Sequence, residues 1–139
     1  LQTNLAGTIE KVMAENTILR ARAKDAGLMA DPFQLAFYVF QEHGTYVSYC
    51  PSLDFSSSGR DFNEAVENFH KCFQLHIDCC IEAGTLHDDL LVHGWKFTKK
   101  SIVPPSFPAL MKGTEMKKLM NSDLGFERVV TSVRLPLFA

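Results

Sequence analysis

Residues 46–69 read YVSYCPSLDFSSSGRDFNEAVENF, and within this stretch a strand-like pattern gives way to a helical one. Aromatic and β-branched residues up to Cys50 are typical of a β-strand. Pro51 ends that strand because proline has no backbone N–H to donate to a neighbouring strand. A further short strand is expected at residues 53–58, and Gly59 stops it. The stretch therefore predicts two short strands before the pattern changes.

A long helix is expected to follow, from Asp61 to about Ala83. Asp61 is a good N-cap, and Glu64 stands three residues later, which is the arrangement of a capping box. Gly84 is expected to end the helix. Apolar residues recur at helical spacing and should form one stripe that packs on a sheet: Phe62, Val66, Phe69, Phe73, Ile77 and Cys80.

Before this stretch, residues 33–41 (FQLAFYVFQ) predict another strand, apolar on both faces. A strand of that kind should be covered on both sides. His43 and Gly44 make a short turn, so residues 45–50 close a hairpin with it. Together with the strand before Gly59, these segments predict a three-stranded antiparallel meander.

The C-terminal half predicts shorter elements. Thr85 is expected to cap a short helix that Gly94 ends. Residues 95–97 are expected to form a brief strand, and residues 107–120 are expected to contain another helix. Residues 126–135 alternate and predict a half-buried strand, placed at a sheet edge because Pro136 follows. The buried side of that strand should be Val129, Thr131, Val133 and Leu135.

The predicted fold class is therefore α+β: a three-stranded antiparallel meander plus a C-terminal strand, packed against one long helix, with additional short helices. Residues 6–25 carry apolar residues at helical spacing. We expect residues 1–30 to form an N-terminal helical extension and residues 31–139 to form the α+β domain.

Composition narrows the function classes. The chain has 139 residues, 46% hydrophobic and 22% charged, with a net charge of -2. It lacks the basic excess of a dedicated nucleic-acid binder and an apolar run of the roughly 20 residues that a membrane-spanning helix needs. Its four cysteines predict no disulfide framework, so we expect a cytoplasmic protein without membrane partners.

One group of residues has the spacing of metal ligands. Cys72, His76 and Cys79 share one flank of the long helix, and thiolates and imidazole are good zinc ligands. Three ligands from a single helix would be an unusual zinc geometry, however. The interpretation we favour is that the cysteines act as small buried hydrophobic residues.

The sequence patterns that would indicate a catalytic site are weaker than this metal-ligand spacing. Asp54 with Glu64 or Glu67 is the only plausible magnesium set, and Cys50 is the only candidate nucleophile. No local pattern places a histidine beside Cys50. We therefore expect no catalytic residues, no metal and no cofactor, and a protein that is not an enzyme.

Residues 46–69 also resemble the HicB family of antitoxins. The family signature is a Tyr-rich strand, Cys-Pro, a polar residue and Leu, a short strand, Gly, and a helix that opens with Glu-Ala and Asn. The matching residues are Tyr46, Tyr49, Cys50, Pro51, Leu53, Gly59, Glu64, Ala65 and Asn68. The resemblance implies a partial, degenerate ribonuclease H-like fold in which these residues maintain the fold.

The resemblance further implies a bacterial type II toxin-antitoxin system, in which the chain binds and occludes a small basic HicA-type mRNA interferase. Leu75, on a second side of the long helix, favours packing against a second helix or a homodimer, and we expect a homodimer. The candidate acidic contacts to a toxin are Asp54, Glu64, Glu67, Asp88 and Asp89.

Two alternatives stay open. The first is a solitary HicB-like domain that binds nucleic acid or regulates transcription through Arg20, Arg22 and Lys24 or the C-terminal lysines, although no clear DNA-binding module follows the motif. The second is a metal-dependent hydrolase.

Overall fold

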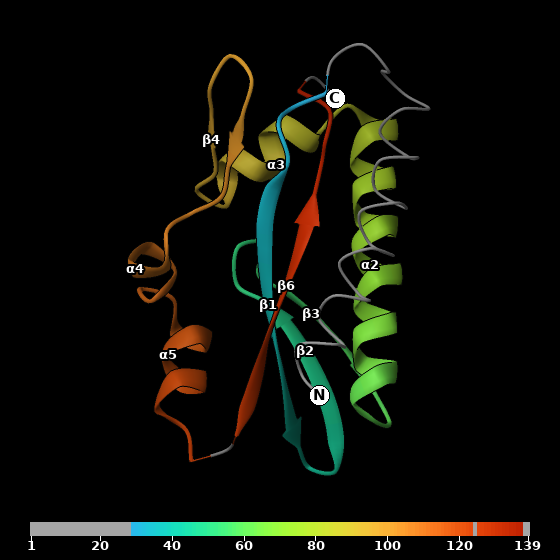
Figure 1. Ribbon diagram of the computed structural model, residues 1–139, viewed down its shortest axis with the longest axis vertical. Coiled ribbons are helices and arrows are strands. Elements are labelled where there is room, and N and C mark those ends of the chain that lie inside the picture. The colour runs from blue at the N-terminus through green and yellow to red at the C-terminus, as the bar shows by residue number, and fades with distance from the viewer. Residues whose placement is uncertain (1–28, 124, 138–139) are drawn as a thin grey trace.

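The computed structural model describes residues 29–123 and 125–137 (Figure 1). The helix expected at residues 6–25 and the basic residues Arg20, Arg22 and Lys24 lie outside the described residues. The elements in chain order are β1 (Phe33–Glu42), β2 (Thr45–Cys50), β3 (Phe55–Gly59), α2 (Phe62–Ala83), α3 (Leu86–Val92), β4 (Lys96–Phe97), β5 (Ile102–Val103), α4 (Phe107–Leu110), α5 (Thr114–Asn121) and β6 (Phe126–Val133).

Four of the strands form one antiparallel sheet in the order β3-β2-β1-β6. The strand β1 lies between β2 and β6, with Tyr38 opposite Tyr49 on one side and Phe37 opposite Val129 on the other. The C-terminal strand β6 is an edge strand, as Pro136 predicts, and Val129, Thr131, Val133 and Leu135 are buried, as the alternation predicts. The predicted α+β class, with a meander and an added C-terminal strand, is confirmed.

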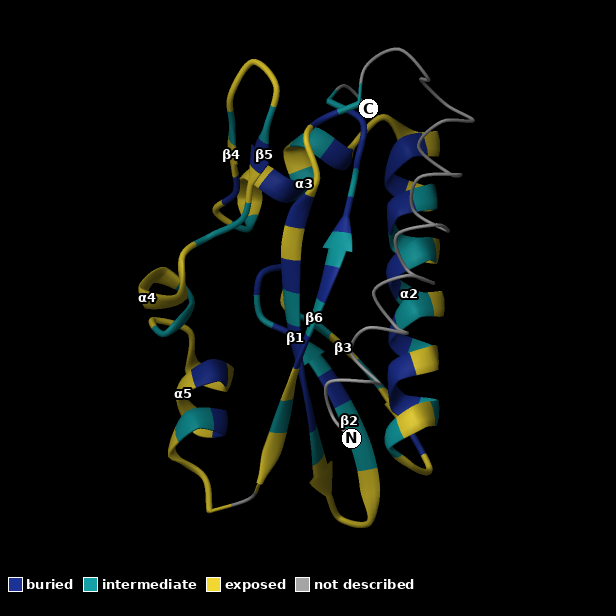
Figure 2. Ribbon diagram, viewed as in Figure 1, coloured by how far each residue is buried: buried dark blue, intermediate teal, exposed yellow. Residues whose placement is uncertain are grey.

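The long helix α2 covers one face of this sheet (Figure 1). Its predicted bounds are confirmed: the Asp61 carboxylate accepts a hydrogen bond from the Glu64 N–H at 2.8 Å, and Gly84 ends the helix with a left-handed φ of 69°. Glycine has no Cβ, so it adopts this conformation without strain. Seven buried residues of α2 face the sheet, and Figure 2 shows this buried side along the helix.

The core between α2 and the sheet is built around aromatic rings. Phe69 stacks on Phe37 with ring centroids 3.9 Å apart and lies 5.3 Å from Phe55 and 6.1 Å from Phe73. Phe37, Phe69 and Phe73 are at most 1% exposed. This close packing joins the first strand, the third strand and the helix.

The opposite face of the sheet is covered by α5. Tyr38 of β1 packs with Met116 and Leu119 in a second buried cluster. The prediction that β1 is covered on both sides is thus confirmed. Residues 107–120, expected to contain a helix, hold two short ones, α4 and α5, because the chain takes an extended conformation at Gly113.

Two local predictions need correction, and a third is confirmed with an addition. β3 begins at Phe55, not at residue 53, because Asp54 has a left-handed φ of 51° that does not fit a strand. The side chain of Thr85 does not cap α3, since its hydroxyl donates to the Cys80 carbonyl instead. The brief strand near Trp95 pairs with β5 in a small hairpin that was not predicted. Over the described ranges, no helix is both long and apolar enough to cross a bilayer.

Candidate functional site

A tight bend joins β2 to β3 and brings together the side chain of Tyr49, which belongs to the sequence motif, and that of Asp54. The N–H of Leu53 donates to the Cys50 carbonyl, and the buried Leu53 side chain anchors the bend in the core. The next residue, Asp54, is exposed, and its carboxylate accepts a hydrogen bond from the Tyr49 hydroxyl at 3.0 Å. Partial burial raises the pKa of Tyr49 well above its usual value, and Asp54 raises it further, so the phenol stays protonated and keeps donating.

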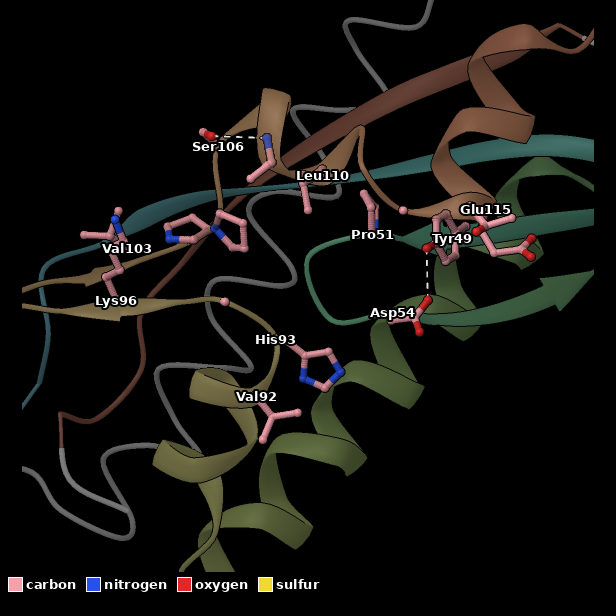
Figure 3. A pocket seen from close by; sticks show the side chains of 16 residues that line it. Tyr49, Pro51, Asp54, Val92, His93, Lys96, Val103, Ser106, Leu110 and Glu115 are labelled. Carbon is pink, nitrogen blue, oxygen red and sulfur yellow. Dashed lines mark hydrogen bonds between the residues drawn. The ribbon is translucent and has the colours of Figure 1, made fainter.

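An open cavity of about 780 Å³ lies beside this bend (Figure 3). Tyr49 and Asp54 line it from the sheet, His93 and Lys96 line it from the end of α3 and from β4, and Glu115 lines it from α5. A cavity of this volume could receive several side chains of a partner.

A neighbouring cavity of about 290 Å³ shares Tyr49, Asp54 and Glu115 with the first and adds Glu42 from the end of β1. We call the surface formed by Glu42, Tyr49, Asp54 and Glu115 the acidic groove. Among the described residues, neither lysine nor arginine lines the smaller cavity, and Lys96 is the lysine in the larger one. The groove therefore carries a local excess of negative charge.

Of the five acidic residues predicted as partner contacts, only Asp54 lines the acidic groove. Glu64 pairs with Arg60, Glu67 is exposed on α2, and Asp88 is exposed on α3. Asp89 contacts His76. The predicted set does not converge on one surface.

Glu42 and Glu115 were missed in the sequence. Glu42 stands at the end of a predicted strand, beside a turn, and nothing in the local pattern sets it apart from a solvated residue. Glu115 comes close to Tyr49 only because α5 folds back over the sheet.

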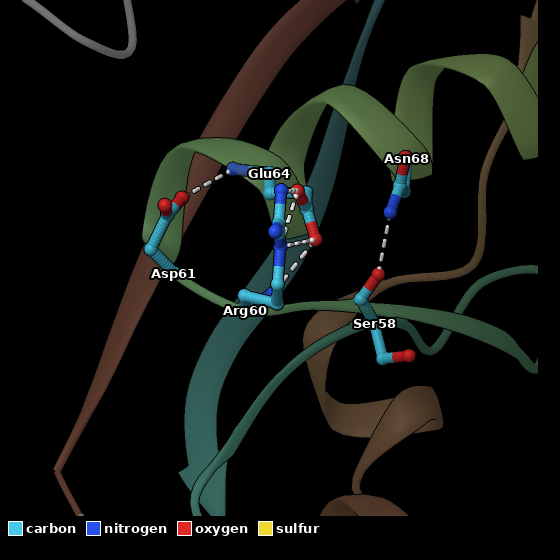
Figure 4. A network of polar contacts seen from close by, with 5 residues as sticks. All are labelled: Ser58, Arg60, Asp61, Glu64 and Asn68. Atoms are coloured by element: carbon cyan, nitrogen blue, oxygen red, sulfur yellow. Dashed lines mark hydrogen bonds and ion pairs between the residues drawn. The ribbon is translucent and has the colours of Figure 1, made fainter.

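The remaining residues of the motif maintain the fold. Gly59 leaves no space for a side chain, because an added Cβ would lie 2.6 Å from the backbone carbon of Glu64. Ala65 is fully buried beneath it. The Asn68 amide donates to the Ser58 carbonyl at 2.7 Å, which ties α2 to β3 (Figure 4). These three residues thus hold the start of α2 close against β3.

Glu64 differs from the predicted capping box. Its carboxylate accepts hydrogen bonds from the backbone N–H and the guanidinium of Arg60, not from the N–H of Asp61 (Figure 4). These bonds with Arg60 lower the pKa of Glu64 below its usual value. The pair is solvent-exposed, so it orders the start of α2 more than it stabilises the fold.

The candidate catalytic and metal sets of the sequence are not brought together either. Asp54, Glu64 and Glu67, the candidate magnesium ligands, do not form a group of three converging ligand atoms in the described part of the chain. Cys79 is exposed, and Cys72 contacts the Ser57 hydroxyl at 3.5 Å. His76 is grouped instead with Cys80 and Asp89.

Cys50 is buried in the core, where its thiol contacts the Ala36 carbonyl and the Ser52 hydroxyl. Burial raises the pKa of Cys50 to about 11, so the thiol is protonated at neutral pH and is not an activated nucleophile.

We expect alkylation of the native, reduced protein with iodoacetamide at neutral pH to modify the exposed Cys79 well before Cys50. Unfolding in urea should abolish this difference, because both thiols are then solvated. Peptide mass mapping over time measures the order. Faster modification of Cys50 than of Cys79 in the native protein would show that Cys50 is an accessible, activated thiol.

Comparison of the chain with protein families, with curated proteins and with solved structures finds no match in any of the three.

Proposed function

We propose that this chain is a cytoplasmic HicB-like antitoxin, which binds and occludes a small basic HicA-type mRNA interferase. The observation that carries the proposal is the acidic groove, which lies at the bend of the same segment, residues 46–69, that resembles the antitoxin family. The groove suits a basic protein partner in both charge and size.

The proposed mechanism is steric and electrostatic occlusion. Three carboxylates in a groove with apolar walls focus their field on the opening, which attracts a lysine- or arginine-rich surface and speeds association. A toxin whose basic, RNA-binding surface is seated on this groove can no longer bind messenger RNA. The same carboxylates repel phosphate groups, which favours a protein partner over a nucleic acid at this site.

A homodimer forms part of the proposal. Leu75 is 64% exposed on α2, on a side of the helix that does not face the sheet. In this proposal Leu75 contacts a second copy of the chain, because a helix with an apolar residue on a second side has a second side to bury.

The decisive experiment is co-expression with the product of a neighbouring open reading frame that encodes a small basic protein. We expect that protein alone to arrest growth and to degrade messenger RNA, and co-expression to restore growth with a complex that survives purification. A complex that does not form, or growth that is not restored, would count against the antitoxin role.

Neutralising the groove should weaken this complex. We expect the double variant Asp54→Asn, Glu115→Gln to lower the affinity for the basic partner by about 10- to 100-fold, mainly through slower association. Asparagine tolerates the left-handed φ of 51° at position 54, so the bend should be retained. Surface plasmon resonance at several salt concentrations measures both the affinity and its salt dependence.

The matched control is Glu67→Gln, Asp88→Asn. Like the groove variant, it removes two negative charges, but from exposed positions that do not line the groove. The control should bind nearly as tightly as the unmodified protein. If both double variants weaken binding equally, the net charge of the chain and not the groove attracts the partner.

A further inference from the structure

Three potential metal ligands meet where α2 contacts α3, apart from the residues that define the acidic groove. The Nε2 atom of His76 lies 3.0 Å from the Asp89 carboxylate and 3.7 Å from the Cys80 thiol. The three ligand atoms all lie within 4.8 Å of one another. Within the described residues this is the one group of three or more such side chains that could hold a metal ion.

From this geometry we propose that His76, Cys80 and Asp89 form a Zn²⁺ site that fastens α3 to α2. The proposal is independent of toxin binding. It differs from the sequence hypothesis of Cys72, His76 and Cys79 in two of its three ligands, and it draws them from two helices.

The spacing of the ligand atoms fits a tetrahedral ion. Bonds of about 2.0 to 2.1 Å to nitrogen and oxygen and about 2.3 Å to sulfur place tetrahedral ligand atoms roughly 3.3 to 3.6 Å apart. The two separations made by His76 Nε2, 3.0 and 3.7 Å, bracket that range. The third separation, between the Cys80 thiol and the Asp89 carboxylate, is at most 4.8 Å, and rotation of these two side chains toward the ion would complete the geometry.

The backbone explains why these side chains meet. His76 and Cys80 are one helical turn apart, so they project from the same side of α2. Gly84 then turns the chain with a left-handed φ of 69° and sends α3 back beside α2, which brings Asp89 opposite His76. Phe55 stacks against the His76 ring and holds its orientation.

The donor set selects the class of ion. One nitrogen, one sulfur and one carboxylate oxygen suit a borderline cation such as Zn²⁺, whereas Mg²⁺ and Ca²⁺ prefer oxygen ligands alone. Both ion-pair partners of Asp89 within the described part of the chain are histidines, His76 and His93. A cation at this point would therefore balance a carboxylate that no described lysine or arginine pairs with.

The fourth coordination position is left to water. The side chains of His76 and Asp89 are 37% and 24% exposed, so solvent reaches the cluster. His93 does not complete the set, because its Nδ1 atom contacts the backbone carbonyl of Asp89 at 2.8 Å. That contact leaves His93 as a residue that positions Asp89 beside the other two ligands.

Cys80 must lose its thiol proton to bind a metal ion. Burial raises the pKa of this thiol, and the nearby Asp89 charge raises it further. Zn²⁺ binding would replace the S–H bond of Cys80 by a Zn–S bond, and the proton would leave to the solvent.

The test uses Co²⁺ as a spectroscopic probe and Zn²⁺ as its competitor, with the full-length protein kept reduced. We expect Co²⁺ to produce thiolate-to-metal charge-transfer absorption and the d–d bands of a tetrahedral site, and Zn²⁺ to abolish both. Zn²⁺ should also raise the Tm, because it binds the folded state alone. No absorption in the unmodified protein, or no change of Tm, would overturn the proposal.

The chain offers a neighbouring control for two of the ligands. Cys80→Ser and Asp89→Asn should each weaken Zn²⁺ binding by at least about 100-fold, more than the loss of an outer partner costs. Cys79→Ser and Asp88→Asn change adjacent, exposed residues and should leave binding unchanged. Charge-transfer absorption that survives in Cys80→Ser, or disappears in Cys79→Ser, would assign the metal to other residues and refute this site.

All four substitutions preserve side-chain shape, and circular dichroism of each metal-free variant checks that it is folded. Should Cys80→Ser not fold, Asp89→Asn decides the question, since Asp89 is partly exposed and asparagine can still hydrogen-bond to His76. Unchanged Zn²⁺ affinity in Asp89→Asn would rule out the three-ligand site.

Discussion

Gly59→Ala should destabilise the protein by about 3 kcal/mol, the upper end of the usual cost of overpacking. The added Cβ would lie 2.6 Å from the backbone carbon of Glu64 and still closer to the backbone nitrogen of Ala65. Both atoms belong to the first turn of α2, which the Asp61 cap holds in place. Backbone atoms cannot rotate away as a flexible side chain can, so β3 and α2 must separate. Urea unfolding followed by circular dichroism measures the loss.

The control for this substitution is Gly125→Ala. No heavy atom lies within 4 Å of a Cβ at that position. Its free energy of unfolding should stay within about 0.5 kcal/mol of the unmodified protein. If the two alanine variants were equally stable, the close approach of β3 and α2 would not be a constraint on the fold.

Phe69→Ala should cost about 3 to 5 kcal/mol of stability, as the loss of a fully buried aromatic ring does in other cores. Phe69 is 0% exposed and stacks with Phe37 of β1, Phe55 of β3 and Phe73 one turn along α2. Removing its ring leaves a cavity where the helix meets both strands, and the rigid neighbours can fill it only in part. The same urea titration reports the change.

Lys71→Ala provides the comparison, because Lys71 belongs to the same helix and is exposed. It should change the free energy of unfolding by no more than about 0.5 kcal/mol. If Phe69→Ala does not fold, Phe69→Leu retains apolar volume and should show an intermediate loss. Equal effects of Phe69→Ala and Lys71→Ala would contradict the placement of the core on this side of α2.

The sequence predictions for α2 and the sheet agree closely with the structure because they depend only on residues near one another in the chain. A helix repeats every 3.6 residues and a strand every two, so the positions of apolar residues reveal both the element and its buried side. Phe69, Phe73 and Ile77 follow the first rule, and Val129 and Val133 follow the second. The caps at Asp61 and Gly84 are also local, because each depends on residues within one turn.

Helical spacing alone could not decide whether Cys79 or Cys80 lies beside His76. Positions 76, 79 and 80 all lie near one another on α2, and helical spacing permits His76 to share a flank with either cysteine. The direction in which Gly84 sends the chain places α3 beside Cys80 and leaves Cys79 in solvent. The partner of His76 is therefore set by a contact between two helices and not by either helix alone.

The acidic groove shows the same limit at longer range. Asp54 could be chosen as a candidate contact because it is a charged residue next to a proline bend. Glu42 and Glu115 could not, since they join Asp54 only after β1, the bend and α5 have packed around Tyr38, Met116 and Leu119.

What can be predicted from the order of the amino acids is thus the type and order of the main elements, the buried side of each, and the motif at residues 46–69 that joins them. Those properties depend on neighbours within one or two turns of chain, where geometry is nearly constant. The grouping of Glu42, Asp54 and Glu115, and of His76, Cys80 and Asp89, depends on how separate elements pack. Packing is a collective result of shape and burial, and no single segment of the chain encodes it.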